Sequence, residues 1–265
     1  MKPIWLGFVL PAAFAGMMVS WHPGLAGDST PSDGELLFED RFDLPDGLVT
    51  NEYATWNSNK SGLHTSSIWT VTSGSLFART GRAWTGVPDG QSPDPASLNS
   101  TDSAVFRLTT RRSDFSDFKV EFNVRAIDLT TTPRTPPTDW DGIHVFLRYE
   151  SESSLYYASV LRRDNQVVAK KKVTGGASNG GTYYTLANAT GGVPLDRAWH
   201  HVAVSVRTAS DGSVRVLIAI DGQTALEAID TGAEDSRRPA VGAVGLRGDN
   251  CEFEFDDFTV SAVGQ

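Results

Sequence analysis

Hydrophobic and polar residues alternate along most of the chain in short runs, without the three-to-four-residue spacing of an amphipathic helix. Short runs separated by Gly, Asn, Asp, Ser and Pro are typical of an all-β protein. The pattern predicts strands over 35–42, 68–72, 75–78, 103–108, 118–126, 143–149, 156–163, 167–173, 182–186, 200–207, 214–220, 223–228, 241–247 and 252–260. So many strands favour two stacked sheets over a small barrel. We therefore predict an all-β, two-sheet antiparallel jelly-roll β-sandwich.

Three dipeptides mark tight hairpin turns between predicted strands. Asp164-Asn165, Asp211-Gly212 and Asp221-Gly222 contain residues that accept the left-handed backbone conformations of such turns. The stretch 130–138 contains three prolines and cannot pair as a central strand. We expect it to form a long surface loop.

The N-terminal segment has the order of a secretory signal peptide. Lys2 precedes an apolar run over 3–21, which small residues follow at 24–26. An uncleaved membrane anchor is the alternative interpretation, and no later segment is apolar enough to span a bilayer. We predict a signal peptide over 1–26, a short linker over 27–34 and one sandwich domain over 35–265. After removal of the signal peptide, we expect the mature chain to be secreted and not to be attached to a membrane.

Composition narrows the classes of partner. The formal net charge of −9 disfavours nucleic acid and anionic membrane surfaces as partners. Cys251 is the single cysteine, so the sequence excludes an intrachain disulfide and a cysteine-based metal cluster. We expect no organic cofactor, and we expect the protein to be a monomer.

Two hairpins between Ile143 and Val173 can be placed in register from their own sequence. Pairing Arg148 with Tyr157, and Ser159 with Lys170, segregates the side chains by type. One face is apolar: Ile143, Val145, Leu147, Tyr149, Tyr156, Ala158, Val160, Val167, Ala169 and Val173. The opposite face is basic and partly aromatic: His144, Phe146, Arg148, Tyr157, Ser159, Leu161, Arg163, Val168, Lys170 and Lys172.

A basic, partly aromatic face suits an anionic glycan. Arg and Lys pair with carboxylates or sulfates, while aromatic rings contact the sugar. We predict that Phe146, Ser159, Arg163, Lys170 and Lys172 contact such a ligand. The alternative is a solvated outer face whose charges keep the protein soluble. Trp84 and the pair Trp140-Asp141 lie among loop residues, where tryptophan either stacks on sugars or closes an end of the sandwich.

The C-terminal half carries a resemblance to known folds. Trp199-His200-His201-Val202-Ala203-Val204, followed by 214–222, resembles paired strands of laminin-G-like and pentraxin-like sandwiches. Residues 244–247 and 253–260 resemble the closing strands of secreted glycan-processing jelly rolls. The chain thus resembles the concanavalin A-like lectin/glucanase superfamily, which implies a curved sheet whose concave face often holds a sugar chain. The fold alone does not specify an activity.

His144, Tyr157 and Arg148 are the groups that β-elimination from a uronic acid requires. A cation neutralises the carboxylate, a base removes the C5 proton and an acid protonates the leaving oxygen. Gly142-Ile143-His144 is similar to the Gln-Ile-His strand of jelly-roll alginate lyases, although Gly142 replaces Gln and the other lyase motifs are missing.

Acidic residues near the two ends of the domain allow two further interpretations. One strand carries alternating acidic residues, Glu252, Glu254 and Asp256, and resembles the catalytic strand of laminarinase-type hydrolases. The alternative interpretation is that these acidic residues have a structural role. First and last strands commonly lie side by side in such sandwiches, so neighbouring carboxylates would suit a structural calcium ion. The candidate calcium ligands are Glu39, Asp40, Asp43, Asp256 and Asp257.

Three functions therefore remain open. The first is binding of a polysaccharide or oligosaccharide, acidic in our prediction, on the concave sheet. The second is cleavage of a glycan, by a lyase mechanism in preference to hydrolysis. The third is adhesion to a protein in the manner of laminin-G-like modules.

Overall fold

The computed structural model describes residues 31–88, 94–95 and 104–264, and antiparallel β-strands make up most of this part. The predicted signal segment 1–26 and the first residues of the predicted linker lie outside the described residues. From Pro31 onward the chain clusters into a single unit. Within the described residues, no helix has the length and hydropathy needed to cross a membrane.

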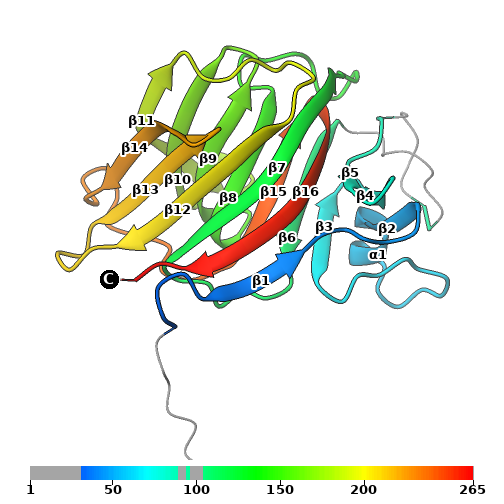
Figure 1. Ribbon diagram of the computed structural model, residues 1–265, viewed down its shortest axis with the longest axis horizontal. Coiled ribbons are helices and arrows are strands. Elements are labelled where there is room, and N and C mark those ends of the chain that lie inside the picture. The colour runs from blue at the N-terminus through cyan, green and yellow to red at the C-terminus, as the bar shows by residue number, and fades with distance from the viewer. Residues whose placement is uncertain (1–30, 89–93, 96–103, 265) are drawn as a thin grey trace, which may run out of the picture. The chain divides into compact units, whose positions relative to one another are not determined.

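One sheet has nine strands and brings the two ends of the domain together. Its strands are β1 (Leu36–Asp40), β2 (Gly47–Asn51), β4 (Ser75–Ala78), β5 (Ala83–Trp84), β7 (Phe118–Leu129), β12 (His200–Thr208), β13 (Val214–Ile220), β14 (Gln223–Asp230) and β16 (Cys251–Ala262). They follow the order β14-β13-β12-β7-β16-β5-β4-β2, and β1 also pairs with β16. The first and last strands of the chain therefore lie side by side (Figure 1).

The other sheet has seven strands and contains both hairpins that the sequence places in register. Its strands are β3 (Trp69–Ser73), β6 (Val105–Thr110), β8 (Gly142–Ser151), β9 (Ser154–Arg162), β10 (Gln166–Ser178), β11 (Gly181–Thr190) and β15 (Ala243–Asp249). Their order is β11-β10-β9-β8-β15-β6-β3, and every pairing is antiparallel. The predicted fold class is thus confirmed.

A single hydrophobic core joins the two sheets. Trp69 from β3 contacts Phe258 from β16 edge to face, with ring centroids 5.2 Å apart. Phe42 stacks on Trp69 at 5.9 Å and meets Phe255 of β16 edge to face at 5.0 Å. These rings have exposed fractions of 1% or less, so the inner faces of both sheets are closed to solvent. Burial of such large rings is the main source of stability in a fold without disulfides.

Every strand that the sequence predicts overlaps a strand of the structure, but three short elements were not predicted. These are β2, β5 and the helix α1 (Glu52–Trp56). The helix begins at Asn51, whose Oδ1 accepts a hydrogen bond from the Ala54 N–H at 3.0 Å. The Asp221-Gly222 turn was predicted and is confirmed, because both residues have positive φ angles, 51° and 76°.

The register of the two predicted hairpins differs from the prediction by two residues. Ser159 pairs with Val168 rather than Lys170, and Tyr157 pairs with Phe146. A shift of two residues keeps every side chain on its face, because side chains alternate along a strand with period two. The predicted apolar and polar faces therefore survive over most of both hairpins.

Two β-bulges account for the exceptions. The pairing of β8 with β9 shifts between Ile143 and His144, so β9 contains one extra residue there. As a result Leu161 packs in the core, Arg162 turns outward, and Arg163 lies beyond the end of β9. A second shift follows Leu147 in β8, and it reverses the side on which the next residue lies. The predicted outward positions of Leu161 and of the residue after Leu147 are therefore wrong.

Candidate functional site

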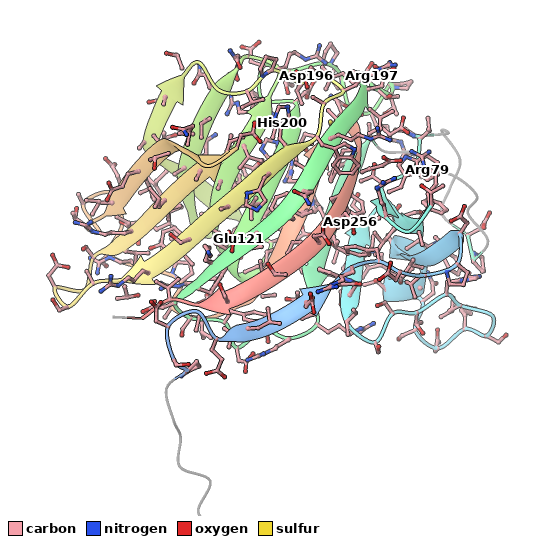
Figure 2. The ribbon with its side chains drawn as sticks, viewed as in Figure 1. Arg79, Glu121, Asp196, Arg197, His200 and Asp256 are labelled. Atoms are coloured by element: carbon pink, nitrogen blue, oxygen red, sulfur yellow. The ribbon has the colours of Figure 1, made fainter. Side chains whose placement is uncertain are left out.

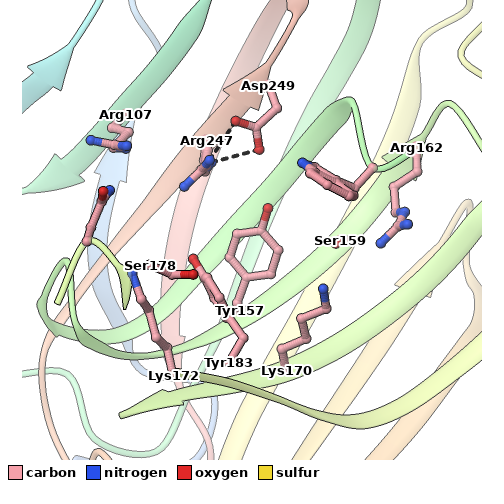
Figure 3. A pocket seen from close by; sticks show the side chains of 12 residues that line it. Arg107, Tyr157, Ser159, Arg162, Lys170, Lys172, Ser178, Tyr183, Arg247 and Asp249 are labelled. Carbon is pink, nitrogen blue, oxygen red and sulfur yellow. Dashed lines mark hydrogen bonds and ion pairs between the residues drawn. The ribbon is translucent and has the colours of Figure 1, made fainter. Parts of the chain in front are cut away.

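A cavity of about 460 Å³ opens on the outer face of the seven-stranded sheet (Figure 3). Five strands contribute to it, namely β6, β9, β10, β11 and β15. Its lining comprises the cations Arg107, Arg162, Lys170, Lys172 and Arg247, the rings Trp140, Tyr157 and Tyr183, and the polar residues Ser159, Ser178, Asn179 and Asp249. This volume lies within the range of small-molecule sites.

All three arginines that line the cavity are paired with carboxylates, Arg107 with Glu152 at 3.1 Å. Arg247 donates from Nε and Nη2 to the two oxygens of Asp249, at 2.8 and 2.7 Å, as the dashed lines in Figure 3 show. Burial raises the pKa of the Asp249 carboxyl, but Arg247 outweighs burial and holds that pKa well below its ordinary value. Arg162 likewise donates from Nε and Nη2 to the two carboxylate oxygens of Asp164. These pairs orient guanidinium groups at the cavity and cancel part of their charge.

The two lysines of β10 that line the cavity, Lys170 and Lys172, carry charge that is not cancelled in this way. Within the described residues Lys170 has no carboxylate in ion-pair contact, and burial together with nearby Arg162 lowers its pKa. Burial and the neighbouring arginines lower the pKa of Lys172 to about 8. The Lys172 ammonium donates to the backbone carbonyl of Glu152 and lies 4.8 Å from the centre of the Tyr183 ring. The cavity therefore has a net positive charge.

Aromatic rings form the floor of the cavity. Tyr157 is 7% exposed, stacks on His144 at 4.8 Å and meets Tyr183 edge to face at 5.8 Å. Phe146, a predicted ligand contact, packs beneath Tyr157 at 5.9 Å and does not line this cavity. Burial raises the pKa of the Tyr157 hydroxyl well above its ordinary value, so this hydroxyl stays protonated.

His144 lies beneath the aromatic floor of the cavity, between the side chains of Ser159 and Asp249. Its Nδ1 lies 3.0 Å from Ser159 Oγ, and its Nε2 lies 3.3 Å from an Asp249 oxygen without hydrogen-bond geometry. Burial lowers the pKa of the imidazole more than Asp249 raises it, so His144 is neutral. The ionised Asp249 favours the proton on Nε2, and Ser159 then donates to Nδ1. His144 has no exposed surface and does not line the cavity, so it positions Ser159 and Tyr157.

Arg148 is not at the cavity, contrary to the prediction that placed it beside His144 and Tyr157. The bulge after Leu147 gives Arg148 a φ of 46° and turns its side chain away from the outer face. Its guanidinium donates to Asp117, at 2.6 Å, and to the backbone carbonyls of Ser116 and Pro239. Arg148 is 1% exposed, and its role is to anchor these segments.

The loop before β8 places Trp140 at the cavity rim and Asp141 beneath it. Trp140 is 52% exposed and lines the cavity. Asp141 is 1% exposed and does not face this cavity, because its carboxylate accepts hydrogen bonds from Thr138, Arg163 and Asn250. Asp141 and Arg163, both predicted ligand contacts, thus fix the loop that presents Trp140.

Trp84 lies on the other sheet, far from the predicted face. Its indole N–H donates to Glu252 at 2.8 Å, and the Arg79 guanidinium lies 3.8 Å from its ring centre. Arg79 and Arg125 both donate to Glu254. Burial raises the pKa of Glu252; at Glu254 burial acts in the same direction, but the two arginines outweigh it and lower the pKa. Figure 2 shows Arg79 on the face of the nine-stranded sheet turned to the viewer.

The candidate calcium ligands do not assemble into a metal site. Asp40 accepts the indole N–H of Trp69 at 2.6 Å, Glu39 pairs with Arg41, and Asp257 accepts from Asn123. The remaining candidates, Asp43 and Asp256, join no group of three or more ligating side chains in the described residues. β1 and β16 are neighbours as predicted, but their acidic side chains have separate partners.

Seven lining residues were not identified from the sequence: Arg107, Arg162, Ser178, Asn179, Tyr183, Arg247 and Asp249. The bulge in β9 moved Arg162 to the outer face, and no local pattern reveals such an insertion. Ser178, Asn179 and Tyr183 belong to the β10–β11 hairpin, whose outward face was not assigned from the sequence. Arg107, Arg247 and Asp249 belong to β6 and β15, which join β8–β10 only through long-range pairing. Strand order across the sheet, which sequence alone did not provide, would have been needed to find them.

No protein-family model and no curated protein sequence matches the chain. Solved structures do match it. A protein of unknown function with a galectin-like fold from Bacillus subtilis has a TM-score of 0.56 and 13% identity, over 88% of this chain and 98% of its own. A structure described with endo-acting O-glycanases of the human gut microbiota has a TM-score of 0.53 and 9% identity, over 87% of this chain and 100% of its own.

LamAcat from Zobellia galactanivorans has a TM-score of 0.50 and 12% identity, over 86% of this chain and 97% of its own. Likeness at such low identity shows the fold and nothing further. The chain has the concanavalin A-like sandwich fold that the resemblance of its C-terminal half implied.

Proposed function

We propose that the chain binds an acidic oligosaccharide in the cavity on the outer face of the seven-stranded sheet. The observation that carries the proposal is Lys170, a half-buried cation without a carboxylate partner among the described residues, at a cavity with four further cations. A carboxylate or sulfate of the ligand would supply the missing partner. This excess of positive charge is local, because the whole chain has a net charge of −9.

The rings around the cavity support a sugar as the carrier of that anionic group. Tyr157 and Tyr183 cover the floor and Trp140 stands at the rim, where flat apolar faces can contact sugar rings. A concave site of this volume also favours a small ligand over the flat surface of a protein partner. Among structures of the same fold, one is described with O-glycanases, which is consistent with a glycan ligand.

The side-chain positions support binding rather than β-elimination. A general base must reach the proton that it removes, and His144 lies beneath Tyr157 without lining the cavity. Arg148, the predicted partner of the uronate carboxylate, is buried against Asp117. With wild-type protein and a polyuronate we therefore expect no absorbance from an unsaturated uronate product.

Calorimetric titration with an oligogalacturonate and with a neutral oligosaccharide of equal length tests the proposal. We expect Lys170→Met to weaken acidic-ligand binding at least about tenfold, equivalent to about 1.4 kcal/mol. Lys119→Met is the matched control, because Lys119 pairs with Glu121 on the nine-stranded sheet. Equal affinity for acidic and neutral ligands, or an unchanged affinity in Lys170→Met, would overturn the proposal.

We also propose that the protein acts outside the cell. The support is the signal-like order of residues 1–26, which lie outside the described part of the chain. Mass spectrometry of the protein recovered from culture medium should find a new N-terminus near residue 27. An intact Met1 on cell-associated protein would contradict this proposal.

A further inference from the structure

Another cavity, of about 500 Å³, lies at the end of the sandwich where β12 turns into β13. Its lining comprises Asp117, Arg207, Thr208, Ala209, Ser210 and Arg215. It shares no lining residue with the cationic cavity beside Lys170, so the two cavities are separate. A volume of this size is again within the range of small-molecule sites.

Arg207 brings an unpaired guanidinium group to this cavity. In the described part of the chain it makes no hydrogen bond and no ion pair. Its Nε is buried, so a ligand cannot reach that atom. The terminal nitrogens Nη1 and Nη2 are not buried in this way, and the side chain as a whole is partly exposed. Arg207 therefore offers an anion the two parallel N–H groups at the tip of its guanidinium.

A second arginine lies directly opposite on the next strand. Arg207 of β12 pairs with Arg215 of β13 in the antiparallel register, and both line the cavity. Like charges directly opposite each other destabilise a sheet. Arg215 has Glu227 as a partner at 3.2 Å, but these side chains are 57% and 50% exposed, so solvent weakens the pair. An anion between the two arginines would offset their repulsion.

The nearest carboxylates are already engaged elsewhere. Asp117 lines the cavity, but it accepts a hydrogen bond from Arg148 at 2.6 Å and is compensated by that cation. Asp211 accepts hydrogen bonds from the backbone N–H and the hydroxyl of Ser213, and it does not line the cavity. The positive charge of Arg207 is left without a carboxylate partner among the described residues, and a single negative charge on a ligand would balance it.

The other lining residues favour a ligand with hydroxyl groups. Ser210 is exposed, and its hydroxyl has no partner in the part of the chain that the structure describes. The Thr208 hydroxyl accepts a hydrogen bond from Arg148 at 2.8 Å, so its own proton is free to donate. The lining contains no aromatic ring, in contrast to the cationic cavity. An apolar acid would leave these hydroxyl groups without partners, whereas a hydroxylated acid would pair with them.

We propose that this cavity binds a small sugar acid, with its carboxylate between Arg207 and Arg215 and its hydroxyl groups at Thr208 and Ser210. A carboxylate is planar and carries one charge, which matches the tip of the Arg207 guanidinium. The proposal does not depend on the proposed function. The cationic cavity holds an oligosaccharide, and this cavity holds a free acid.

Calorimetric titration of Lys170→Met with glucuronate tests the proposal, because this substitution weakens the cationic cavity. Glucose, which lacks the carboxylate, and inorganic sulfate are the comparison ligands. We expect the further substitution Arg207→Met to weaken glucuronate binding at least about tenfold. Arg207→Lys keeps the charge but lacks the parallel N–H groups, so it should lose most of this affinity as well. Arg197→Met, which removes an exposed arginine from the loop before β12, is the matched control and should leave the affinity unchanged.

Thermal melting without ligand checks that the variants fold, and we expect no loss of stability, because removal of Arg207 ends its repulsion with Arg215. If Arg207→Lys binds glucuronate as tightly as its parent, the site attracts anions without specificity and the proposal is wrong. Equal affinity for glucose and glucuronate, or tighter binding of sulfate, would also overturn it. None of these results changes the expected binding of an acidic oligosaccharide at Lys170, which is measured separately.

Discussion

The outer faces of the two sheets carry similar groups in different balance. On the nine-stranded sheet, Arg79 and Arg125 share the carboxylate of Glu254, and Arg79 also covers the ring of Trp84. On the seven-stranded sheet, Arg247 and Arg162 have carboxylate partners, whereas Lys170 has none in the described part of the chain.

This difference indicates which of the two faces would gain from binding an anionic ligand. Charges that compensate one another within a face hold its strands together and leave a ligand little to gain, as at Glu254. A charge that stays uncompensated and half buried lowers stability, and such groups concentrate at functional sites. Lys170 is this kind of residue, and the cavity beside it gives an anion access. The presence of Arg and Trp alone therefore does not identify the site; the missing partner does.

The largest effect is expected when the two central carboxylates are neutralised one at a time. Asp249→Asn leaves Arg247, whose side chain is 18% exposed, without its partner, so we expect the free energy of unfolding to fall by about 3 kcal/mol. Glu254→Gln leaves Arg79 and Arg125, whose side chains are 36% and 33% exposed, and should cost about 1–2 kcal/mol. Urea unfolding followed by tryptophan fluorescence measures both. Equal losses of unfolding free energy would show that solvent screens the ion pairs of Asp249 and Glu254 to the same extent. That result would contradict the difference between the two faces.

Two histidines should give the two faces opposite pH dependence. Burial lowers the pKa of His144, so the folded state binds fewer protons there, and stability should fall as pH drops below the ordinary histidine pKa of about 6.5. Burial also opposes charge on His200, but the hydrogen bonds that its ring donates to Asp221 and Asp196 outweigh burial and raise its pKa. The His200 contribution is then complete below about pH 6.5 and is lost as pH rises through the raised pKa.

Unfolding free energies of wild type, His144→Gln and His200→Gln between pH 5 and 9 check both signs. We expect His200→Gln to cost most at pH 5 and least at pH 9. His144→Gln should flatten the loss of stability on the acid side. The same pH dependence in both variants would contradict the assignment of a neutral His144 and a charged His200.

The sequence predicted the fold well because its strands alternate strongly. The bounds of β12 and β13 were predicted to within one residue, and the Asp221-Gly222 turn between β13 and β14 is where the turn chemistry requires it. The faces of β8–β10 survived a register error of two residues, because the error matched the side-chain period. Hydrophobic alternation shows directly which side chains of a strand share a face. It identifies the neighbouring strand only where a recognisable turn joins the two.

The site was predicted only in part, because bulges and long-range pairing decide the rest. Tyr157, Ser159, Lys170, Lys172 and Trp140 line the cavity as predicted from their faces and loop. Arg148 carries the same charge as Lys170 and lies on the same strand as His144, yet one bulge turns its side chain into the interior. Bulges leave no periodic trace in a sequence, since one inserted residue looks like any other.

Trp84 of β5 and Trp140 of the loop before β8 are expected to differ in function. Trp84→Phe removes the hydrogen bond to Glu252 and should cost about 1 kcal/mol of stability without changing glycan affinity. Trp140→Phe keeps an exposed ring but offers a smaller apolar surface at the cavity, so we expect a several-fold loss of affinity and a stability change within about 0.5 kcal/mol. Thermal melting and calorimetric titration measure the two quantities. A loss of affinity in Trp84→Phe would move the site to the nine-stranded sheet.

The smallest effect concerns the stability of the variant that tests binding. Burial and the nearby arginine lower the pKa of Lys170, so its charge is disfavoured in the folded state without a ligand. Lys170→Met removes this penalty while keeping a long apolar side chain, and should raise the free energy of unfolding by about 0.5–1 kcal/mol at pH 7. Urea unfolding without ligand measures the change, and Lys119→Met, which loses an ion pair with Glu121, should not show the gain. A destabilised Lys170→Met would mean that the lysine is already compensated by the protein. In that case the contrast between the two faces, and with it the reason for a bound anion, would disappear.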